Sequence, residues 1–462
     1  MVENFDLVVI GSGSGLDVAN GAAENGLKVA IIESGPLGGT CLNRGCIPSK
    51  MLLHVADLVE NMRSSHKFSV DIDNISVNFQ KIVKEVSDFV DDESSGIEKY
   101  LYGAKNPTLF KGVAEFTDHK ELRVGNTLIR GGKILIAAGA RPKIPEIPGL
   151  IEAGYLTSTE ALRLSSLPES LVIIGGGYIA VELAHFFGSL GSKVTLIQRS
   201  DRLLTREDEE ISRSFTKEFS KKHRVLLSSE PEMITKKEGV YQVNVKSSVE
   251  ENNMTVRAKE LLIAVGVTPN TDLLKPERTG VILDERGFII VDECLETNIK
   301  GIFALGDVIG KYMLKHSANL EAQYSYYNII DSGNKISVNY NVIPHAVFTS
   351  PQISGVGFTE QEAKITGLDF VVGKYRYIDT GMGMALKDES GFVKILVEKA
   401  SRKILGCHIM GIDASTLLHE VVVAMNAGNG NIENITETVH THPALSEVVL
   451  RAAISAREVL QR

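Results

Sequence analysis

The sequence predicts an α/β fold with two Rossmann-like units, followed by a C-terminal α+β domain. A strand, a glycine-rich turn, a helix and a second strand follow one another in residues 5–33, and the same order recurs in residues 171–199. From about residue 340 the chain alternates strand-like runs with helical segments, which is typical of an antiparallel sheet covered by helices. The length of 462 residues suits several domains, because single hydrophobic cores rarely grow beyond about 250–300 residues.

The first unit has the pattern of a dinucleotide-binding site. Its first strand, FDLVVI, ends in GSGSG, where Gly11, Gly13 and Gly15 let the backbone approach a pyrophosphate at a helix N-terminus. The second strand ends at Glu33, which is placed to accept hydrogen bonds from ribose hydroxyls. Leu16 stands where a third glycine is usual, so we expect the helix to lie slightly further from the strands. Phosphate binding should be retained despite Leu16, because it depends mainly on backbone N–H groups.

The second unit, LVIIGGGYIAVELAHFFGSLGSKVTLIQR, repeats this pattern around Gly175 and Gly177. Two such units indicate two dinucleotide sites. An NAD site needs an acid at the end of the second strand, but Gln198 takes that place here. Three arginines follow it, namely Arg199, Arg202 and Arg206. An arginine without the acid favours the 2′-phosphate of NADPH, and a solvated basic patch is the alternative.

Composition excludes several classes of function. The net charge of -9 argues against general attraction to nucleic acid or to an anionic membrane. No apolar run approaches the roughly 18–20 residues that span a bilayer. The N-terminus lacks the basic region of a signal peptide, so we expect a cytoplasmic protein.

Two of only 4 cysteines, Cys41 and Cys46, lie five residues apart in GGTCLNRGCIPSK. A zinc site needs about four ligands, and Cys294 and Cys407 are far away in sequence. Lasting structural disulfides are uncommon in the cytoplasm. A short loop between two thiols favours reversible closure, so a redox pair is preferred over a metal clip or two inert cysteines.

Four motifs, in this order and at these spacings, are similar to those of one known family: GGTCLNRGCIPSK, GGGYIAVE, GIFALGDV and HTHPALSE. On these motifs the chain resembles the flavin-dependent pyridine nucleotide–disulfide oxidoreductases, which include dihydrolipoyl dehydrogenase, glutathione reductase, mycothione reductase and mercuric reductase. The resemblance covers nearly the whole chain and implies FAD and NADPH or NADH as cofactors. Mercuric reductase fits less well, because the chain ends in SAREVLQR without a cysteine pair.

The resemblance implies a role for each cysteine. Cys46 would be the charge-transfer thiol beside the flavin, and Cys41 the interchange thiol that attacks the substrate disulfide. We expect a loop placed at a helix start to help lower a thiol pKa. Arg44 replaces a small apolar residue of the family inside this loop. It would stabilise a thiolate, steer an acidic substrate, or point to solvent.

The resemblance also implies an acid–base pair. His442 matches the family histidine that manages the proton of the interchange thiol, and Glu447 matches the carboxylate that orients it. His440 lies close by and is interpreted as structural. In this family the histidine comes from the other subunit, so the resemblance implies an obligate homodimer formed by the C-terminal domain.

Further cofactor positions follow from the resemblance alone. Lys50 and Glu182 match an ion pair near the reactive flavin nitrogen, for which a helix-surface pair is the alternative. Tyr178 matches a ring that covers the flavin until nicotinamide displaces it, and simple packing is the alternative. Lys315-His316 resembles the mycothione reductase pattern. The other matched positions are Thr40, Gly139, Gly266, Asp307 and Ala318.

The expected domains are an FAD domain in residues 1–145 and 266–338, an NAD(P) domain in 146–265 and an interface domain in 339–462. The predicted function is NADPH-linked reduction of a small disulfide. The alternative is a dihydrolipoyl dehydrogenase that uses NAD, in which case a 2-oxoacid dehydrogenase complex is an expected partner. A docking subunit and a flavin quinone reductase are rivals from other classes.

Overall fold

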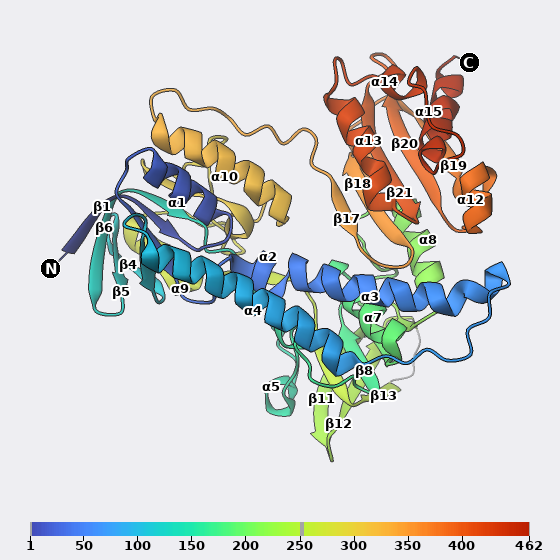
Figure 1. The fold of residues 1–462 in the computed structure, drawn as a ribbon, viewed down its shortest axis with the longest axis horizontal. Helices are drawn as coiled ribbons and strands as arrows, with labels where there is room; N and C mark the ends of the chain where they lie inside the picture. The colour runs from blue at the N-terminus through green and yellow to red at the C-terminus, as the bar shows by residue number, and fades with distance from the viewer. Residues whose placement is uncertain (1, 250–253, 462) are drawn as a thin grey trace. The chain divides into compact units, whose positions relative to one another are not determined.

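The computed structural model describes residues 2–249 and 254–461, and its chain divides into two compact units. Unit 1 comprises residues 1–51, 81–143 and 266–339, and unit 2 comprises the rest. The chain therefore enters unit 2 after residue 143 and returns to unit 1 at residue 266. In Figure 1 the blue N-terminal strands and the yellow α10 belong to unit 1, and the green and red elements belong to unit 2.

Unit 1 is built on a seven-stranded sheet with the order β3-β2-β1-β6-β5-β4, in which β16 also pairs with β6. The central strand β1 runs parallel to β2 and β6. Its side chains alternate between two cores, because successive residues of a strand point to opposite faces. The strands are β1 (Val2–Ile10), β2 (Val29–Glu33), β3 (Thr108–Lys111), β4 (Ala114–Asp118), β5 (Glu121–Val124), β6 (Thr127–Ile136) and β16 (Ile302–Ala304).

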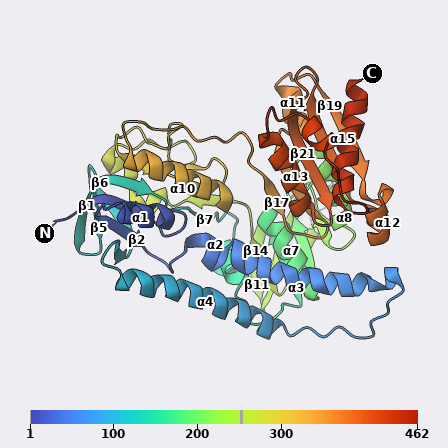
Figure 2. The same cartoon turned by 45° about the horizontal axis from the view of Figure 1, so that its top comes forward.

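Two helices of unit 1, α1 (Gly15–Glu24) and α10 (Lys315–Ile330), lie side by side on one face of this sheet (Figures 1 and 2). They share a core with Leu7 and Val9 of β1. The helix α4 (Phe79–Gly103) contributes Leu101 to the same core. The first predicted strand–turn–helix–strand unit is therefore confirmed, and its helix starts directly at the glycine turn.

Unit 2 contains the second dinucleotide-binding pattern. A four-stranded parallel sheet with the order β10-β9-β8-β14 is accompanied by an antiparallel sheet of β11, β12 and β13. The helix α7 (Tyr178–Leu190) follows β8 and is buried along most of its length. The strands are β8 (Ser170–Ile174), β9 (Lys193–Ile197), β10 (Arg224–Leu226), β11 (Ser229–Lys237), β12 (Val240–Ser247), β13 (Met254–Ala258) and β14 (Glu260–Ile263).

The C-terminal part of unit 2 is the predicted antiparallel sheet covered by helices. Five strands pair in the order β17-β18-β21-β20-β19, and α13 (Ala414–Asn426) and α15 (Ser446–Leu460) pack on the sheet. The strands are β17 (His345–Val347), β18 (Gln352–Gly357), β19 (Phe370–Arg376), β20 (Phe392–Glu398) and β21 (Ile404–Gly411). Other helices of unit 2 are α5 (Leu150–Ala153), α6 (Ser158–Ala161), α8 (Glu209–Phe219), α11 (Glu360–Ile365), α12 (Gly381–Leu386) and α14 (Glu433–Thr436). The α/β fold class predicted from the sequence is confirmed.

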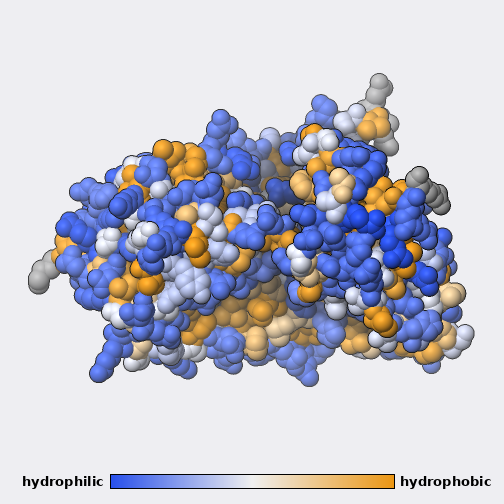
Figure 3. Space-filling model, turned by 90° about the horizontal axis from the view of Figure 1, so that it is seen from above, coloured by the Kyte–Doolittle hydropathy of each residue, from blue (hydrophilic) through white to orange (hydrophobic). Residues whose placement is uncertain are grey.

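Within the described residues, none of the helices combines the length and the apolar character needed to cross a bilayer. The face of the molecule drawn in Figure 3 is mainly hydrophilic, with apolar side chains in separate patches. This surface agrees with the ordinary composition and negative net charge of the chain.

Candidate active site

The first glycine turn of unit 1 has a backbone that only glycine adopts easily. Gly11 has a φ of 102°, and a Cβ at that position would lie 2.3 Å from the carbonyl oxygen of Ala137. A Cβ at Gly15 would lie only 2.9 Å from side-chain atoms of Val9 and Ala137. The expectation that Leu16 keeps the helix further from the strands is therefore wrong. The close contact is made one residue earlier, at Gly15.

The acid at the end of β2 faces this turn. Glu33 Oε2 accepts hydrogen bonds from the backbone N–H and the hydroxyl of Ser12, at 2.9 and 2.8 Å. Its Oε1 accepts from the backbone N–H of Gly35 at 2.7 Å. A carboxylate offers about four acceptor positions, so Glu33 keeps capacity for a ribose hydroxyl beside the turn.

The second glycine turn repeats the first closely. Gly175 has a φ of 127°, and a Cβ there would lie 2.2 Å from the carbonyl oxygen of Ala264. Gln198 follows β9 directly, and its Cδ would lie 2.8 Å from a Cβ at Gly176. Gln198 therefore occupies over the second turn the place that Glu33 occupies over the first.

The arginines after Gln198 differ in their surroundings. Arg202 pairs with Asp201 at 3.1 Å and is mostly covered. Arg199 and Arg206 are exposed. Among the described residues, no hydrogen bond or ion pair engages the Arg199 side chain. It is therefore a cation at the end of β9 that remains available to a ligand.

Two glycines predicted as cofactor positions lie at equivalent points of the two patterns. Gly139 and Gly266 both have positive φ, 64° and 116°. Each precedes a short strand, β7 (Ala140–Pro142) and β15 (Val267–Pro269), and these strands pair with each other in unit 1. The two similar sequence runs thus form one antiparallel ribbon where the chain leaves and re-enters unit 1.

The cysteine segment is helical, whereas a loop was expected. Cys41 lies in the short helix α2 (Gly39–Arg44), and Cys46 is the first residue of α3 (Cys46–Ser64). Only Gly45 separates the helices, and a Cβ there would lie 2.9 Å from the carbonyl oxygen of Thr40. The first glycine turn lies against this segment, since a Cβ at Gly39 would lie 2.6 Å from the Cα of Gly13.

Both cysteines are in the thiol state, with Cys41 half-buried and Cys46 exposed. A hydrogen bond to Cys46 and burial raise the pKa of the Cys41 thiol far above its usual range. The expectation that the helix start lowers a thiol pKa is thus wrong for Cys41, because it lies within α2, is partly buried and is hydrogen-bonded to Cys46.

The cation that acts on Cys41 is Lys315, at the start of α10. Its positive charge lowers the pKa of the Cys41 thiol, against the larger effects of Cys46 and burial. Lys315 Nζ donates a hydrogen bond to Ser14 Oγ at 2.8 Å, which fixes the ammonium group beside the first glycine turn. The Arg44 guanidinium lies near Gly35 and Glu33. A Cβ placed on Gly35 would be 3.8 Å from Arg44 Nη2 and 3.5 Å from Glu33 Oε1. This guanidinium is therefore on the ribose side of the turn.

The predicted acid–base pair is assembled within unit 2. His442 Nδ1 lies 2.9 Å from Glu447 Oε1, and Glu447 Oε2 accepts from the backbone N–H of Ala444 at 3.2 Å. The hydrogen bond from His442 lowers the pKa of Glu447. The His442 side chain is 76% exposed, so its other ring nitrogen is accessible. His440 instead is 5% exposed, with both ring nitrogens engaged by Glu420 and Thr438, which agrees with a structural role.

Tyr178, at the start of α7, is fixed by residues that the sequence did not single out. Its hydroxyl donates to one oxygen of the buried Glu207, and His345 Nε2 lies 2.8 Å from the other oxygen. The Tyr178 and His345 rings stack, with centroids 6.3 Å apart and planes 19° apart. Glu207 lies in a run of charged residues, which in a sequence is typical of an exposed segment. No sequence pattern therefore identified Glu207 as a buried partner of Tyr178.

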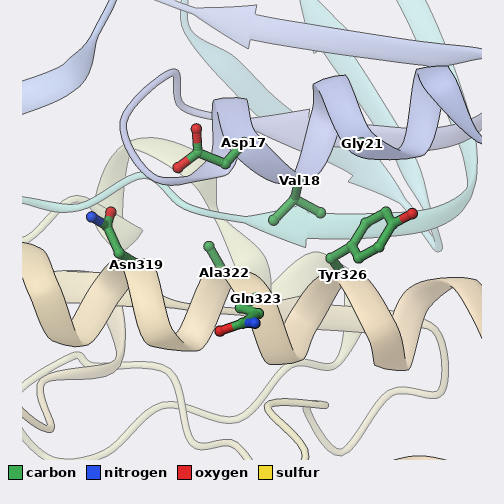
Figure 4. A pocket seen from close by; sticks show the side chains of 7 residues that line it. All are labelled: Asp17, Val18, Gly21, Asn319, Ala322, Gln323 and Tyr326. Carbon is green, nitrogen blue, oxygen red and sulfur yellow. The ribbon is translucent and has the colours of Figure 1, made fainter.

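A small cavity of about 220 Å³ lies between α1 and α10 (Figure 4). Its lining includes one charged side chain, Asp17, and the Tyr326 ring beside Gly21. None of the predicted site residues lines it, so we assign it no role in the chemistry.

Comparison with known proteins decides what this arrangement is. The family model described as pyridine nucleotide-disulphide oxidoreductase matches residues 5–322, and the dimerisation domain of the same family matches residues 343–453. The chain belongs to the pyridine nucleotide-disulphide oxidoreductase family.

Relatives within this family share the full length of the chain. Mycothione reductase of Mycobacterium tuberculosis strain H37Rv is 36% identical, over 99% of this chain and 100% of its own. Dihydrolipoyl dehydrogenase of Chlamydia pneumoniae is 35% identical, over 99% and 98%. The copper(II) complex of the HOCl-induced flavoprotein disulfide reductase RclA from Escherichia coli superposes with a TM-score of 0.86 and 30% identity, over 98% and 100%.

Membership of this oxidoreductase family implies FAD and a pyridine nucleotide, and unit 1 offers groups that fit FAD. The half-buried Asp307 carboxylate has no hydrogen bond or ion pair to other described residues. Burial raises the pKa of Asp307, so a hydroxyl-bearing ligand such as the ribityl chain would satisfy it. Thr40 is exposed on α2, and Ala318 is buried on α10.

The predicted pairing of Lys50 with Glu182 remains a prediction, because the two residues belong to different units. Within unit 2, the Oε1 of Glu182 accepts a hydrogen bond from the backbone N–H of Phe348 at 3.0 Å. Among the described residues, no group of three or more potential ligands for a metal ion was found.

Proposed function

We propose that this oxidoreductase uses NADPH to reduce a low-molecular-weight disulfide through the Cys41–Cys46 pair. The proposed preference for NADPH rests on the residues at the end of β9. Gln198 replaces the acid found at the equivalent Glu33, and the exposed Arg199 follows it. A guanidinium there recognises a 2′-phosphate through charge-assisted hydrogen bonds, whereas an acid would recognise ribose hydroxyls.

The chemistry belongs to the cysteines. The first glycine turn and Asp307 would hold FAD, whose chemistry when bound would be to supply the electron pair of NADPH to the Cys41–Cys46 disulfide. Two thiols result. The Cys41 thiolate then attacks one sulfur of the substrate, forming a mixed disulfide and releasing the other sulfur as a thiolate. Cys46 attacks the mixed disulfide, releases the second thiol and restores the Cys41–Cys46 bond.

His442 handles the protons of this exchange. Its free ring nitrogen would accept the Cys41 proton before attack and then protonate the departing thiolate. Glu447 fixes the ring through Nδ1 and stabilises its charged form. The exposure of His442 and the family's dimerisation domain support a homodimer in which this histidine serves the cysteines of the partner subunit. The low cysteine content supports a cytoplasmic location.

A second candidate is dihydrolipoyl dehydrogenase activity with NAD. The 35% identity to the Chlamydia pneumoniae dihydrolipoyl dehydrogenase over nearly the full chain favours it. The two candidates differ in their nucleotide and in the direction of electron flow.

Anaerobic stopped-flow reduction of the holoenzyme by NADPH and by NADH separates them. We expect NADPH to reduce the flavin faster at equal low concentration, and the Arg199→Ala variant to lose about 10- to 100-fold of that preference. Lys193→Ala removes an exposed charge at the other end of β9 and should leave the preference unchanged. Faster reduction by NADH would instead favour dihydrolipoyl dehydrogenase.

A further inference from the structure

The second glycine turn carries a tyrosine whose hydroxyl is tied to a buried carboxylate. Tyr178 follows Gly177 directly, at the first position of α7. Its hydroxyl donates to Glu207 Oε1, while His345 engages Glu207 Oε2 at 2.8 Å. The three side chains therefore form a continuous hydrogen-bonded set, which also includes the stacking of the Tyr178 and His345 rings.

Glu207 is suited to hold other side chains in place. It is 1% exposed, its backbone N–H donates to Leu204 at 3.0 Å, and its backbone carbonyl accepts from Gln361 Nε2 at 2.9 Å. Burial alone would raise the pKa of Glu207, but the hydrogen bonds from His345 and Tyr178, together with the electrostatic effects of His345 and His408, outweigh burial and lower that pKa. The carboxylate is thus ionised and fixed, and its bond to the phenol is a strong, charge-assisted one.

The tyrosine is held as a neutral donor. Burial and the negative charge of Glu207 raise the pKa of Tyr178 well above its usual range, so the phenol keeps its proton. The charge of the neighbouring Arg206 acts on Tyr178 in the opposite direction, which places this arginine close to the ring.

We propose that Glu207 and His345 act as positioning residues that latch the Tyr178 ring in one orientation and so limit the binding of pyridine nucleotide. This inference rests on the proposed function and on the role that the family resemblance implies for Tyr178, a ring that covers the flavin until nicotinamide displaces it. This latch, which consists of Glu207 and His345, determines the free energy required to move the Tyr178 ring. Nucleotide binding must supply that free energy.

The position of Glu207 in the chain supports this coupling. Glu207 lies between the end of β9 and the start of α8, in the same segment as Arg199 and Arg206. His345 opens β17 in the sheet of the C-terminal domain. A nucleotide that binds the arginines of this segment therefore contacts the stretch of backbone that carries the latch.

The expected size of the effect follows from the strength of one hydrogen bond. When the binding-competent state is only a fraction of the population, the apparent Kd rises by the reciprocal of that fraction, and a pre-organising change removes the penalty. The loss of one hydrogen bond to a charged group changes the ratio of the two ring positions by about tenfold or more. Releasing the ring should therefore tighten nucleotide binding by about tenfold.

The test uses FAD-loaded holoenzyme and three variants, namely Tyr178→Phe, Glu207→Gln and the double variant. Nucleotide Kd is measured by calorimetry, and flavin reduction and reoxidation by disulfide are measured separately by stopped flow. Tyr178→Phe should lower the Kd about tenfold, and Glu207→Gln should lower it less, because Gln keeps one neutral acceptor. The double variant should match Tyr178→Phe alone, since Glu207 acts through that hydroxyl. Reoxidation by the disulfide should not change.

Glu209→Gln is the matched control, because it removes the same charge two residues further on, at an exposed position paired with Arg213. FAD content and thermal midpoints show whether each variant is folded. The latch is overturned if Tyr178→Phe leaves the Kd unchanged, or if Glu207→Gln alters the Kd equally in the wild-type enzyme and in the Tyr178→Phe variant. A wild-type flavin that neither NADPH nor NADH reduces would instead refute the proposed function itself.

Discussion

Lys315 places a positive charge beside the Cys41 thiol and the first glycine turn. Its hydrogen bond to Ser14 Oγ orients the ammonium group, and Ser14 Oγ in turn donates to Asn319 Oδ1 at 3.0 Å. Cys41 needs this charge, because its hydrogen bond to Cys46 and burial both disfavour the thiolate. A positive neighbour is the ordinary means by which a protein makes a cysteine reactive.

Replacing Lys315 should make Cys41 less reactive. In Lys315→Met the pKa of Cys41 rises further, since the lowering effect of the ammonium group is lost. The thiolate fraction at a given pH then falls. We expect alkylation of Cys41 in the reduced enzyme to slow several-fold near neutral pH, with its pH profile moved to higher pH. Mass spectrometry of timed iodoacetamide labelling measures this rate.

Arg44 provides the comparison for Lys315. It is only three residues from Cys41 in sequence, but its guanidinium lies beside Gly35 and Glu33. Arg44→Gln should therefore leave the alkylation profile of Cys41 where it is. A shift as large as that of Lys315→Met would show that general positive charge near the cysteines, and not Lys315, controls the thiol.

At the scale of elements, the N-terminus of α8 is joined to the C-terminal sheet by a buried ion pair. Asp208 caps α8 by accepting from the backbone N–H of Glu210. Both its oxygens also accept from Lys394 Nζ, at 2.8 and 3.0 Å, and Lys394 is 2% exposed. Glu360 Oε2 lies 2.6 Å from the same ammonium group. These contacts hold the segment that carries Glu207.

Asp208→Asn should destabilise the protein by about 3 kcal/mol, because it leaves a buried ammonium group short of one carboxylate while keeping the helix cap. Denaturant unfolding of the holoprotein measures the loss. Glu218→Gln, which removes the ion pair of this α8 residue with the exposed Lys221 just after the helix, should change stability by less than about 0.5–1 kcal/mol. Equal losses in both variants would contradict a special role for the buried pair.

The same pair implies a direction for the pH dependence of stability. Burial would raise the pKa of Asp208, but Lys394, together with His408 and the backbone N–H of Glu360, outweighs burial and lowers that pKa below the ordinary value of 3.8. The stabilisation is therefore present above that ordinary value and is lost as the pH falls through the lower, folded-state pKa. In Asp208→Asn this acid-dependent part of the stability loss should disappear.

The sequence predicted the elements well where glycine turns and apolar strands recur. Both strand–turn–helix–strand units follow from their apolar segments, because buried parallel strands read as continuous apolar runs. The antiparallel C-terminal sheet follows from the alternation of strand-like and helical segments. It did not predict that Cys41 lies in a helix, since a six-residue helix between glycines has no periodic signal. The close contact at Gly15 was also missed, because it depends on the side chains of Val9 and Ala137.

Within the candidate site, the sequence predicted a contact where one family motif contains both residues. His442 and Glu447 lie in one motif, and the structure brings them to hydrogen-bonding distance. Lys315, Glu207 and His345 lie in segments far apart in sequence, and their partners are set by tertiary contacts. For Cys41, helix position alone gave the wrong direction of the pKa shift, since a hydrogen bond to Cys46 determines it.

At the scale of the whole molecule, the proposed site needs cysteines from one subunit and His442 from the other. This predicts complementation between two inactive variants, Cys41→Ser and His442→Gln. A mixed dimer would contain one site with both defects and one intact site. Random reassortment of the subunits makes half of the dimers mixed, and each mixed dimer has one intact site of two. The mixture should therefore recover about a quarter of the wild-type activity. If each site were formed within one chain, the mixture would remain as inactive as the separate variants.

The most direct test of the central claim is the state of the cysteines before and after reduction by NADPH. Air-oxidised holoenzyme is treated anaerobically with one equivalent of NADPH, denatured, alkylated and mapped by mass spectrometry. We predict that Cys41 and Cys46 are linked to each other before reduction and alkylated after it, while Cys294 and Cys407 are alkylated in both samples. A flavin that is reduced while Cys41 and Cys46 do not change would contradict electron transfer through this pair.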